Sequence, residues 1–192
     1  MKRTLARALM VVSATALIAA CGQKTDETNV AQQPDANPTA TIPTPADEAA
    51  APDFVTKAAM SDMYEVEAAK VALARSQNAE VKKFAQMMVD DHTKSTNDLK
   101  SAIAASGLSL TPPSALDEAH AGKIQELKDE EAADFDKAYL NDQVDAHQMA
   151  LDLLQRYAND GDNAQLKGFA ATTAPVVQTH YDHAKQMRDA MQ

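Results

Sequence analysis

The stretch that decides the fold is NAEVKKFA at residues 78–85, because the chain repeats it as NAQLKGFA at residues 163–170. Five of the eight positions are identical, and the Val/Leu and Glu/Gln pairs are close. Each copy follows a polar turn and opens an apolar pattern of helical period. The repeat therefore predicts two similar helical hairpins, and two packed hairpins make a four-helix bundle.

The apolar pattern around the two copies predicts four long helices, at about 53–75, 79–106, 131–158 and from 162 to the C-terminus. Pro112 and Pro113 break the chain after the second helix. A shorter helix is expected in that connection, from Ser114 as its N-cap to about Leu127. Asp162 is expected to cap the last helix. The fold class is thus all-α, a four-helix bundle with an extra short helix in the connection between its second and third long helices.

The composition also favours helices. Hydrophobic residues make up 45% of the chain, but aromatic residues only 4%, and tryptophan is absent. Ala, Leu, Val and Met must therefore build the core, whereas a β-sandwich would need more aromatic and β-branched residues.

The N-terminus predicts export. Basic residues precede an apolar run from Ala8 to Ala20, and this run ends directly before Cys21, the only cysteine. That order is typical of a signal peptide, so we expect residues 1–20 to be removed. The position of Cys21 resembles the lipobox of bacterial lipoproteins, in which the cysteine is acylated and becomes the new N-terminus. By this resemblance the mature chain reaches the membrane through a lipid on Cys21.

The residue after the cysteine and the segment that follows refine this expectation. The residue after Cys21 is Gly22 and not Asp, which in bacterial lipoproteins would imply retention at the inner membrane. By the same resemblance, the chain is expected to be an outer-membrane lipoprotein that faces the periplasm. Five of the eight prolines lie between residues 21 and 52, among Thr, Gln, Asn and Asp. Such a segment buries too little apolar surface to fold, so it is interpreted as a disordered linker. Residues 53–192 then form the bundle domain.

The charge excludes one class of partner. Cleavage after residue 20 removes three positive charges from a net charge of −10 and leaves −13. An acidic chain without a basic patch is not expected to bind nucleic acid. Self-association into a homo-oligomer is compatible with the sequence, and no protein partner is indicated.

Each long helix carries one ligand-type side chain on its apolar face. In chain order these side chains are Glu65, His92, His147 and His180. Imidazole and carboxylate together suit Fe, Cu, Zn or Mn, so one interpretation is a metal site in the bundle core. The other interpretation is a buried hydrogen-bond network among the same residues, and the sequence leaves both open.

The spacing disfavours a di-iron centre. Carboxylate di-metal bundles use a Glu three residues before a His on two helices. The residues three positions before the helical histidines are Val89, Val144 and Val177. No catalytic triad is recognisable either, so the sequence favours binding over enzymatic turnover.

Several blocks resemble the bacterial family catalogued as domain of unknown function 4142. They are Glu65-Val66-Glu67, residues 81–85, Asp90-Asp91-His92-Thr93-Lys94, residues 135–140 with His147, and Pro175 with His180. The resemblance covers about residues 53–190. It implies a ferritin-like four-helix fold and an envelope location, and no established activity. It also implies that Asp91, Asp136 and Tyr139 support the four ligand candidates.

Together these observations predict an exported envelope lipoprotein whose bundle binds a transition metal in its core, for metal handling or stress protection. The alternative is a non-catalytic structural or interaction module that holds a buried Glu/His network.

Overall fold

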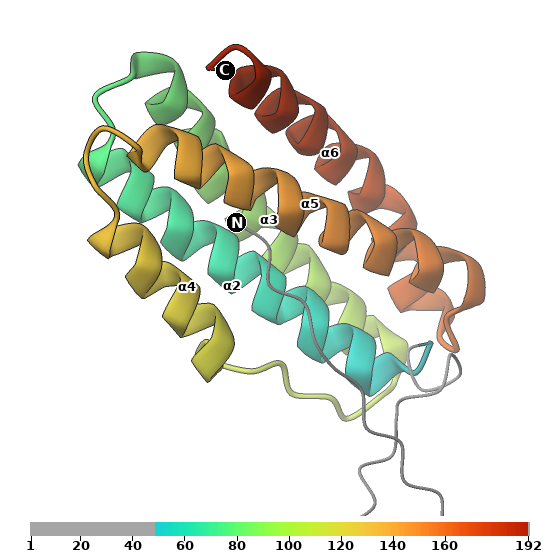
Figure 1. Cartoon of the computed structure of the whole chain (residues 1–192). Coiled ribbons are helices and arrows are strands. Elements are labelled where there is room, and N and C mark those ends of the chain that lie inside the picture. Colours follow the sequence, from blue (N-terminus) through green and yellow to red (C-terminus); the bar gives the residue numbers. More distant parts are fainter. Residues whose placement is uncertain (1–48, 192) are drawn as a thin grey trace, which may run out of the picture. The chain divides into compact units, whose positions relative to one another are not determined.

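The computed structural model describes residues 49–191, which form five helices (Figure 1). These are α2 (Ala51–Arg75), α3 (Ala79–Ser106), α4 (Glu118–Asp129), α5 (Phe135–Asp160) and α6 (Ala164–Asp189). The signal peptide, Cys21 and the linker up to residue 48 lie outside the described residues. None of the helices within residues 49–191 is both long and apolar enough to cross a lipid bilayer.

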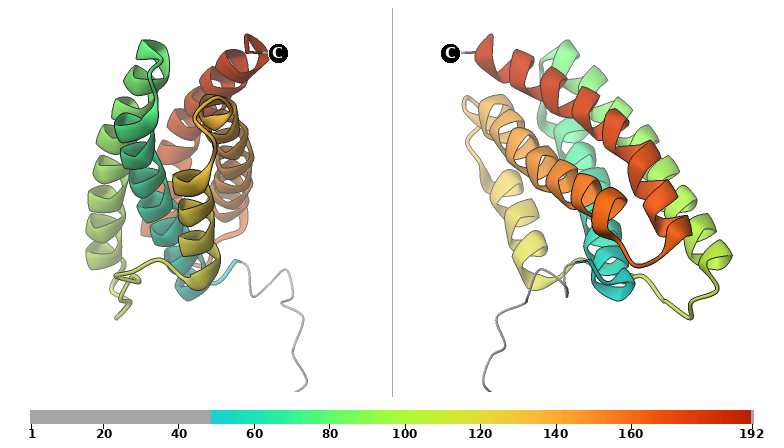
Figure 2. Two further views of the ribbon diagram at one scale, coloured as in Figure 1. Left: turned by 60° about the vertical axis from the view of Figure 1, so that its left-hand side comes forward. Right: turned by 90° about the vertical axis from the view of Figure 1, so that its right-hand side faces the viewer.

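The four long helices close into a bundle of two hairpins. Helix α2 pairs with α3 and α5 pairs with α6, while α3 also packs on α6 and α2 on α5. The short helix α4 lies outside this bundle, mainly against α2 (Figures 1 and 2). The prediction of an all-α four-helix bundle with an extra short helix is therefore confirmed.

The two repeat copies begin with the residues that cap α3 and α6. The Asn78 side chain accepts from the Glu80 and Val81 amides, and the Asn163 side chain accepts from the amides of Gln165 and Leu166. Such caps satisfy amides that the helix leaves without a partner. The prediction that Asp162 caps α6 is wrong, because its carboxylate accepts from the Tyr157 hydroxyl at 2.9 Å instead.

Three other helix starts differ from the prediction. Helix α4 begins at Glu118 rather than Ser114, since the Asp117 carboxylate provides the cap through the His120 amide at 2.8 Å. Helix α5 begins at Phe135, four residues later than expected, because residues 131–134 form a turn. Helix α2 begins at Ala51 and so includes two residues of the segment interpreted as linker. One of them is a proline in the first turn, where the backbone nitrogen needs no hydrogen-bond acceptor.

A polar layer divides the core into two apolar clusters. On α3, Met88 belongs to one cluster and Leu99 to the other, and His92 lies between them. The same order holds on α2, α5 and α6, so every long helix brings polar side chains to the same level of the bundle. The buried polar residues of this layer are Asp62, Glu65, His92, Gln143, His147 and His180.

The turn between α5 and α6 offers a stability test at Gly161. A Cβ placed there would lie 2.5 Å from the Tyr157 carbonyl oxygen and 2.6 Å from its ring. We expect Gly161→Ala to lower the free energy of unfolding by about 1–3 kcal/mol, because Tyr157 is buried and cannot yield freely. Urea denaturation measures the change.

Gly168 is the matched control, since it lies within α6 and a Cβ placed there would meet no neighbouring group within 4 Å. Gly168→Ala should raise the free energy of unfolding by roughly 0.5–1 kcal/mol through helix propensity. Equal effects at Gly161 and Gly168 would contradict the close packing of the turn against Tyr157.

Candidate metal centre

Three imidazoles meet in the polar layer, each from a different helix. His92 on α3, His147 on α5 and His180 on α6 are 3%, 0% and 2% exposed. Their ring centroids form a nearly equilateral triangle with sides of 5.5, 5.5 and 5.4 Å. One nitrogen of each ring lies within 4.8 Å of the other two. The bundle thus gathers three nitrogen donors away from solvent.

The other nitrogen of each ring already has an acceptor. The acceptors are Asp62 Oδ1 for His92 Nδ1 at 2.9 Å, the Gln143 carbonyl for His147 Nδ1 at 2.8 Å, and Asp91 Oδ2 for His180 Nε2 at 2.9 Å. With their N–H groups engaged in this way, the rings in their neutral form carry a lone pair on Nε2 of His92, Nε2 of His147 and Nδ1 of His180. These three nitrogens are buried and have no hydrogen-bond partner among the described residues.

This pattern fits a metal ion. Histidine ligands almost always donate their second ring N–H to a carboxylate or a backbone carbonyl, which fixes the tautomer and the ring orientation. All three histidines do so here. Buried polar atoms are otherwise almost always paired in native proteins, and three unpaired nitrogens on three neighbouring rings could hold a metal ion.

Burial sets the charge state of two of the rings. Desolvation, followed by the neighbouring charge of His92, lowers the pKa of His147 to about 3. The same two causes, in the same order, lower the pKa of His180. Both rings are therefore neutral at pH 7 and able to donate a lone pair. Burial also disfavours the charged form of His92, but the Asp62 hydrogen bond and the Glu65 and Asp62 charges outweigh it and raise that pKa.

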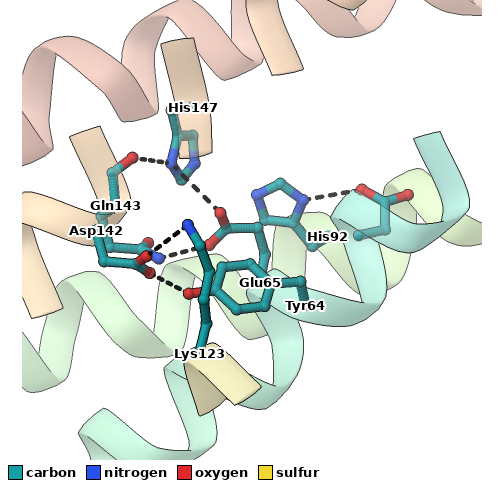
Figure 3. A network of polar contacts seen from close by, with 8 residues as sticks. Tyr64, Glu65, His92, Lys123, Asp142, Gln143 and His147 are labelled. Atoms are coloured by element: carbon teal, nitrogen blue, oxygen red, sulfur yellow. Dashed lines mark hydrogen bonds and ion pairs between the residues drawn. The ribbon is translucent and has the colours of Figure 1, made fainter. Parts of the chain in front are cut away.

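Glu65 lies beside the three histidines. Its Oε2 accepts from Gln143 Nε2 at 2.7 Å, and its Oε1 has no hydrogen-bond partner among the described residues and lies 3.7 Å from His147 Nδ1. In Figure 3 its carboxylate reaches from α2 toward His147, with the His92 ring beside it. Burial raises the pKa of Glu65 to about 7. The Glu65 carboxyl is therefore only partly ionised at neutral pH, and the three nitrogen donors form a group without it.

The three supporting residues fall in different places. Asp91 holds His180, as described above. Tyr139 and Asp136 precede His147 on α5 by 8 and 11 residues, which is roughly 12 and 16 Å along the helix axis. Tyr139 packs between aromatic rings in the apolar cluster that contains Phe135. Among the described residues, no hydrogen bond or ring contact joins Tyr139 or Asp136 to these three histidines, although the charge of Glu65 contributes to the raised pKa of Tyr139.

Asp62 is the supporting residue that the sequence analysis did not single out. It is 5% exposed, bonds His92, and accepts a longer hydrogen bond of 3.4 Å from Thr96 Oγ1. Its signal in the sequence is a carboxylate on the apolar face of α2, three residues before Glu65, where a buried charge requires a partner.

A second polar group attaches α4 to the bundle near this layer. The Tyr64 hydroxyl donates to Asp142, and Lys123 Nζ of α4 lies 3.4 Å from the same carboxylate (Figure 3). Burial, then the charge of Asp142, raises the pKa of Tyr64, so the phenol stays a hydrogen-bond donor. This group links α2, α4 and α5 without contacting the free nitrogens.

Comparison with known proteins gives a family and two similar structures. The family described as "Domain of unknown function (DUF4142)" matches residues 36–187. The structure titled "CopM in the Cu(II)-bound form" has a TM-score of 0.63 at 14% identity, over 74% of this chain and 98% of that chain. The DUF305 fragment from Deinococcus radiodurans has a TM-score of 0.62 at 13% identity, over 71% and 93%. At these identities the likeness is one of fold. No curated protein sequence matches the chain significantly.

Proposed function

The chain belongs to the DUF4142 family, a domain of unknown function, and from that starting point we propose that it is a transition-metal-binding bundle of the cell envelope. The observation that carries the proposal is the set of three buried, unpaired imidazole nitrogens whose opposite ring nitrogens are all engaged. His92, His147 and His180 are the proposed ligands. Asp62, Asp91 and the Gln143 carbonyl orient them.

Of the metals that imidazole suits, which also include iron and nickel, we propose copper or zinc. Imidazole nitrogens suit both ions, whereas magnesium, calcium and manganese prefer oxygen donors. The nearby carboxylates of Asp62, Glu65 and Asp91 offset the charge of a cation in the apolar core. The fold likeness to a protein solved with Cu(II) agrees with copper as one of the two. A bound ion there serves metal storage or delivery, since the donors are enclosed by the bundle.

The alternative interpretation, a buried network that only stabilises the bundle, fits less well. A structural network gains its stability by pairing all of its donors and acceptors. Among the described residues, Nε2 of His92, Nε2 of His147 and Nδ1 of His180 stay unpaired, and so do the Glu65 and Gln143 side-chain oxygens Oε1. Such a layer weakens the metal-free bundle, which is the expected cost of a binding site.

Titration of the metal-free protein with Zn²⁺ and with Cu²⁺ tests the proposal. Variants of Asp62 then test whether binding depends on the orientation of His92. Asp62→Ala removes the acceptor that orients His92 and should weaken metal binding by about 10–100-fold. Asp62→Asn keeps an oxygen acceptor and should lose less. The control is Asp142→Ala, which removes the carboxylate bound to Tyr64 and should leave the affinity unchanged. Equal losses in the Asp62 and Asp142 variants would show that the loss does not arise from orienting His92.

The lipid anchor is the second part of the proposal. It rests on the sequence alone, on Cys21 after an apolar segment with a basic start. We expect Cys21→Ser to release the protein from the membrane fraction into the soluble envelope fraction while the bundle stays folded. Fractionation of cells with immunoblotting measures this. A wild-type chain found in the soluble fraction would contradict lipidation.

A further inference from the structure

The three histidines are enclosed, so a metal ion needs a route to them. None of the three side chains is more than 4% exposed, and the side chains of four helices surround the layer. Two of the residues that hold the rings come nearer to solvent. Asp62, on the α2–α3 side, has a side chain that is 7% exposed, and Asp91, near α6, has one that is 40% exposed.

Asp62 lines two hollow spaces. The outer one is a surface groove of about 460 Å³ between α2, α3 and the connection before α4, and it is lined by Asp62, Met63, Thr93, Thr96, Asn97 and Leu116, among others. The inner one is a cavity of about 20 Å³ among α2, α3, α5 and α6, and it is lined by both Asp62 and His92. Asp62 therefore borders both the surface groove and the cavity that His92 lines.

The lining chemistry suits a cation on its way inward. The groove offers the carboxylates of Asp62 and Glu67 and the polar side chains of Thr93, Thr96 and Asn97, and Lys100 is its one basic residue among the described residues. The cavity offers Ser61, Ser95 and Thr173 beside Asp62 and His92. At about 20 Å³ the cavity has room for about one water molecule, so an ion that enters it must shed most of its hydration. Side-chain oxygens at this point replace part of that shell.

We propose that this groove is the entrance through which a transition-metal cation reaches His92, His147 and His180, with Asp62 as the first buried group that it meets. The inference rests on the proposed metal site and adds the path to it. Asp62 then has two roles, to orient His92 and to receive the ion from the groove.

A kinetic test separates the path from the site. Zn²⁺ uptake and release by the full chain are followed by stopped flow with a fluorescent zinc indicator. The double variant Asn97→Trp/Ala115→Phe fills the groove at two exposed positions. It should slow both uptake and release by about tenfold or more. The dissociation constant should stay the same, because it depends only on the free and bound states.

Two further variants complete the test. Leu116→Ala widens the groove and should speed uptake, which keeps the proposal testable if the double variant folds poorly. Met149→Trp adds the same bulk on the opposite, exposed face of α5, two residues from His147, and should leave the rates unchanged.

Failure of the proposed metal site and failure of the proposed entrance would give different results. If the wild-type chain takes up no Zn²⁺ or Cu²⁺, the proposed function fails, and the entrance fails with it. If the wild-type chain binds metal but neither groove variant changes the uptake rate, only the entrance is wrong. Slower uptake in Lys94→Trp, three residues from Asp91, with normal rates in the groove variants would place the entrance at Asp91 and overturn the proposal.

Discussion

Replacing His147 with leucine should abolish metal binding and at the same time make the metal-free protein more stable. His147 is fully buried, neutral at pH 7, and holds an Nε2 with no partner among the described residues. Leucine has a similar volume and brings no polar atom to be paired. We therefore expect the free energy of unfolding of the metal-free chain to rise by about 1–3 kcal/mol. The Gln143 carbonyl still accepts its hydrogen bond within the helix, so it stays paired when the imidazole N–H is removed.

Metal titration and urea denaturation of the same His147→Leu sample check the two halves of this prediction. His183→Leu is the control, because His183 lies one turn after His180 but packs its ring edge-on against Phe84 at 5.3 Å. It should bind metal like the wild-type chain. If His147→Leu destabilises the metal-free protein by several kcal/mol, the layer is a structural network, and the account of an unpaired site is wrong.

Phe54→Ala should have the largest effect on stability, with a loss of about 3–5 kcal/mol. Phe54 is 0% exposed and stacks on Tyr157 with ring centroids 3.8 Å apart and planes 13° apart. Phe169 also meets it edge-on at 6.2 Å. These rings join the start of α2 to the α5–α6 hairpin, so alanine leaves a cavity where the two hairpins meet.

The same variant should leave metal affinity unchanged under conditions where the protein stays folded. Phe54 precedes Asp62 by eight residues, roughly 12 Å along α2. Met149→Ala, at a 59% exposed position, is the control and should change the free energy of unfolding by less than about 0.5 kcal/mol. A loss below about 1 kcal/mol in Phe54→Ala would show that the aromatic stack does not hold the hairpins together.

Much of the architecture follows from the sequence because helical periodicity is a local property. The repeat at residues 78–85 and 163–170 predicted both hairpins, and Asn78 and Asn163 prove to be equivalent caps. The errors lie at helix ends, where side chains compete for the same amides. Asp162 is an acceptable cap by residue type, but its carboxylate is already bound to Tyr157, five residues earlier in the chain. That contact depends on the folded turn.

The polar layer was predictable in part for the same reason. Periodicity alone places His92, His147 and His180 on the inner faces of their helices, so their meeting requires only a common level in the bundle. Asp62 was not found, because its role depends on how far α2 is shifted along its axis against α3. Asp136 lies on the same face of α5 as His147 but about 16 Å away along the helix axis. Residue spacing predicts which face of a helix a side chain lies on, but not which residues of other helices lie at the same level.

The metal content of the full chain tests the central claim most directly. The chain is purified after growth in medium supplemented with copper or zinc, dialysed, and analysed for bound metal per protein. We predict one equivalent of copper or zinc in the wild-type chain and none in the His92→Ala/His147→Ala double variant, with helical content near that of the wild-type chain. A wild-type chain without stoichiometric metal, or a double variant that retains it, would contradict a metal centre at these three histidines.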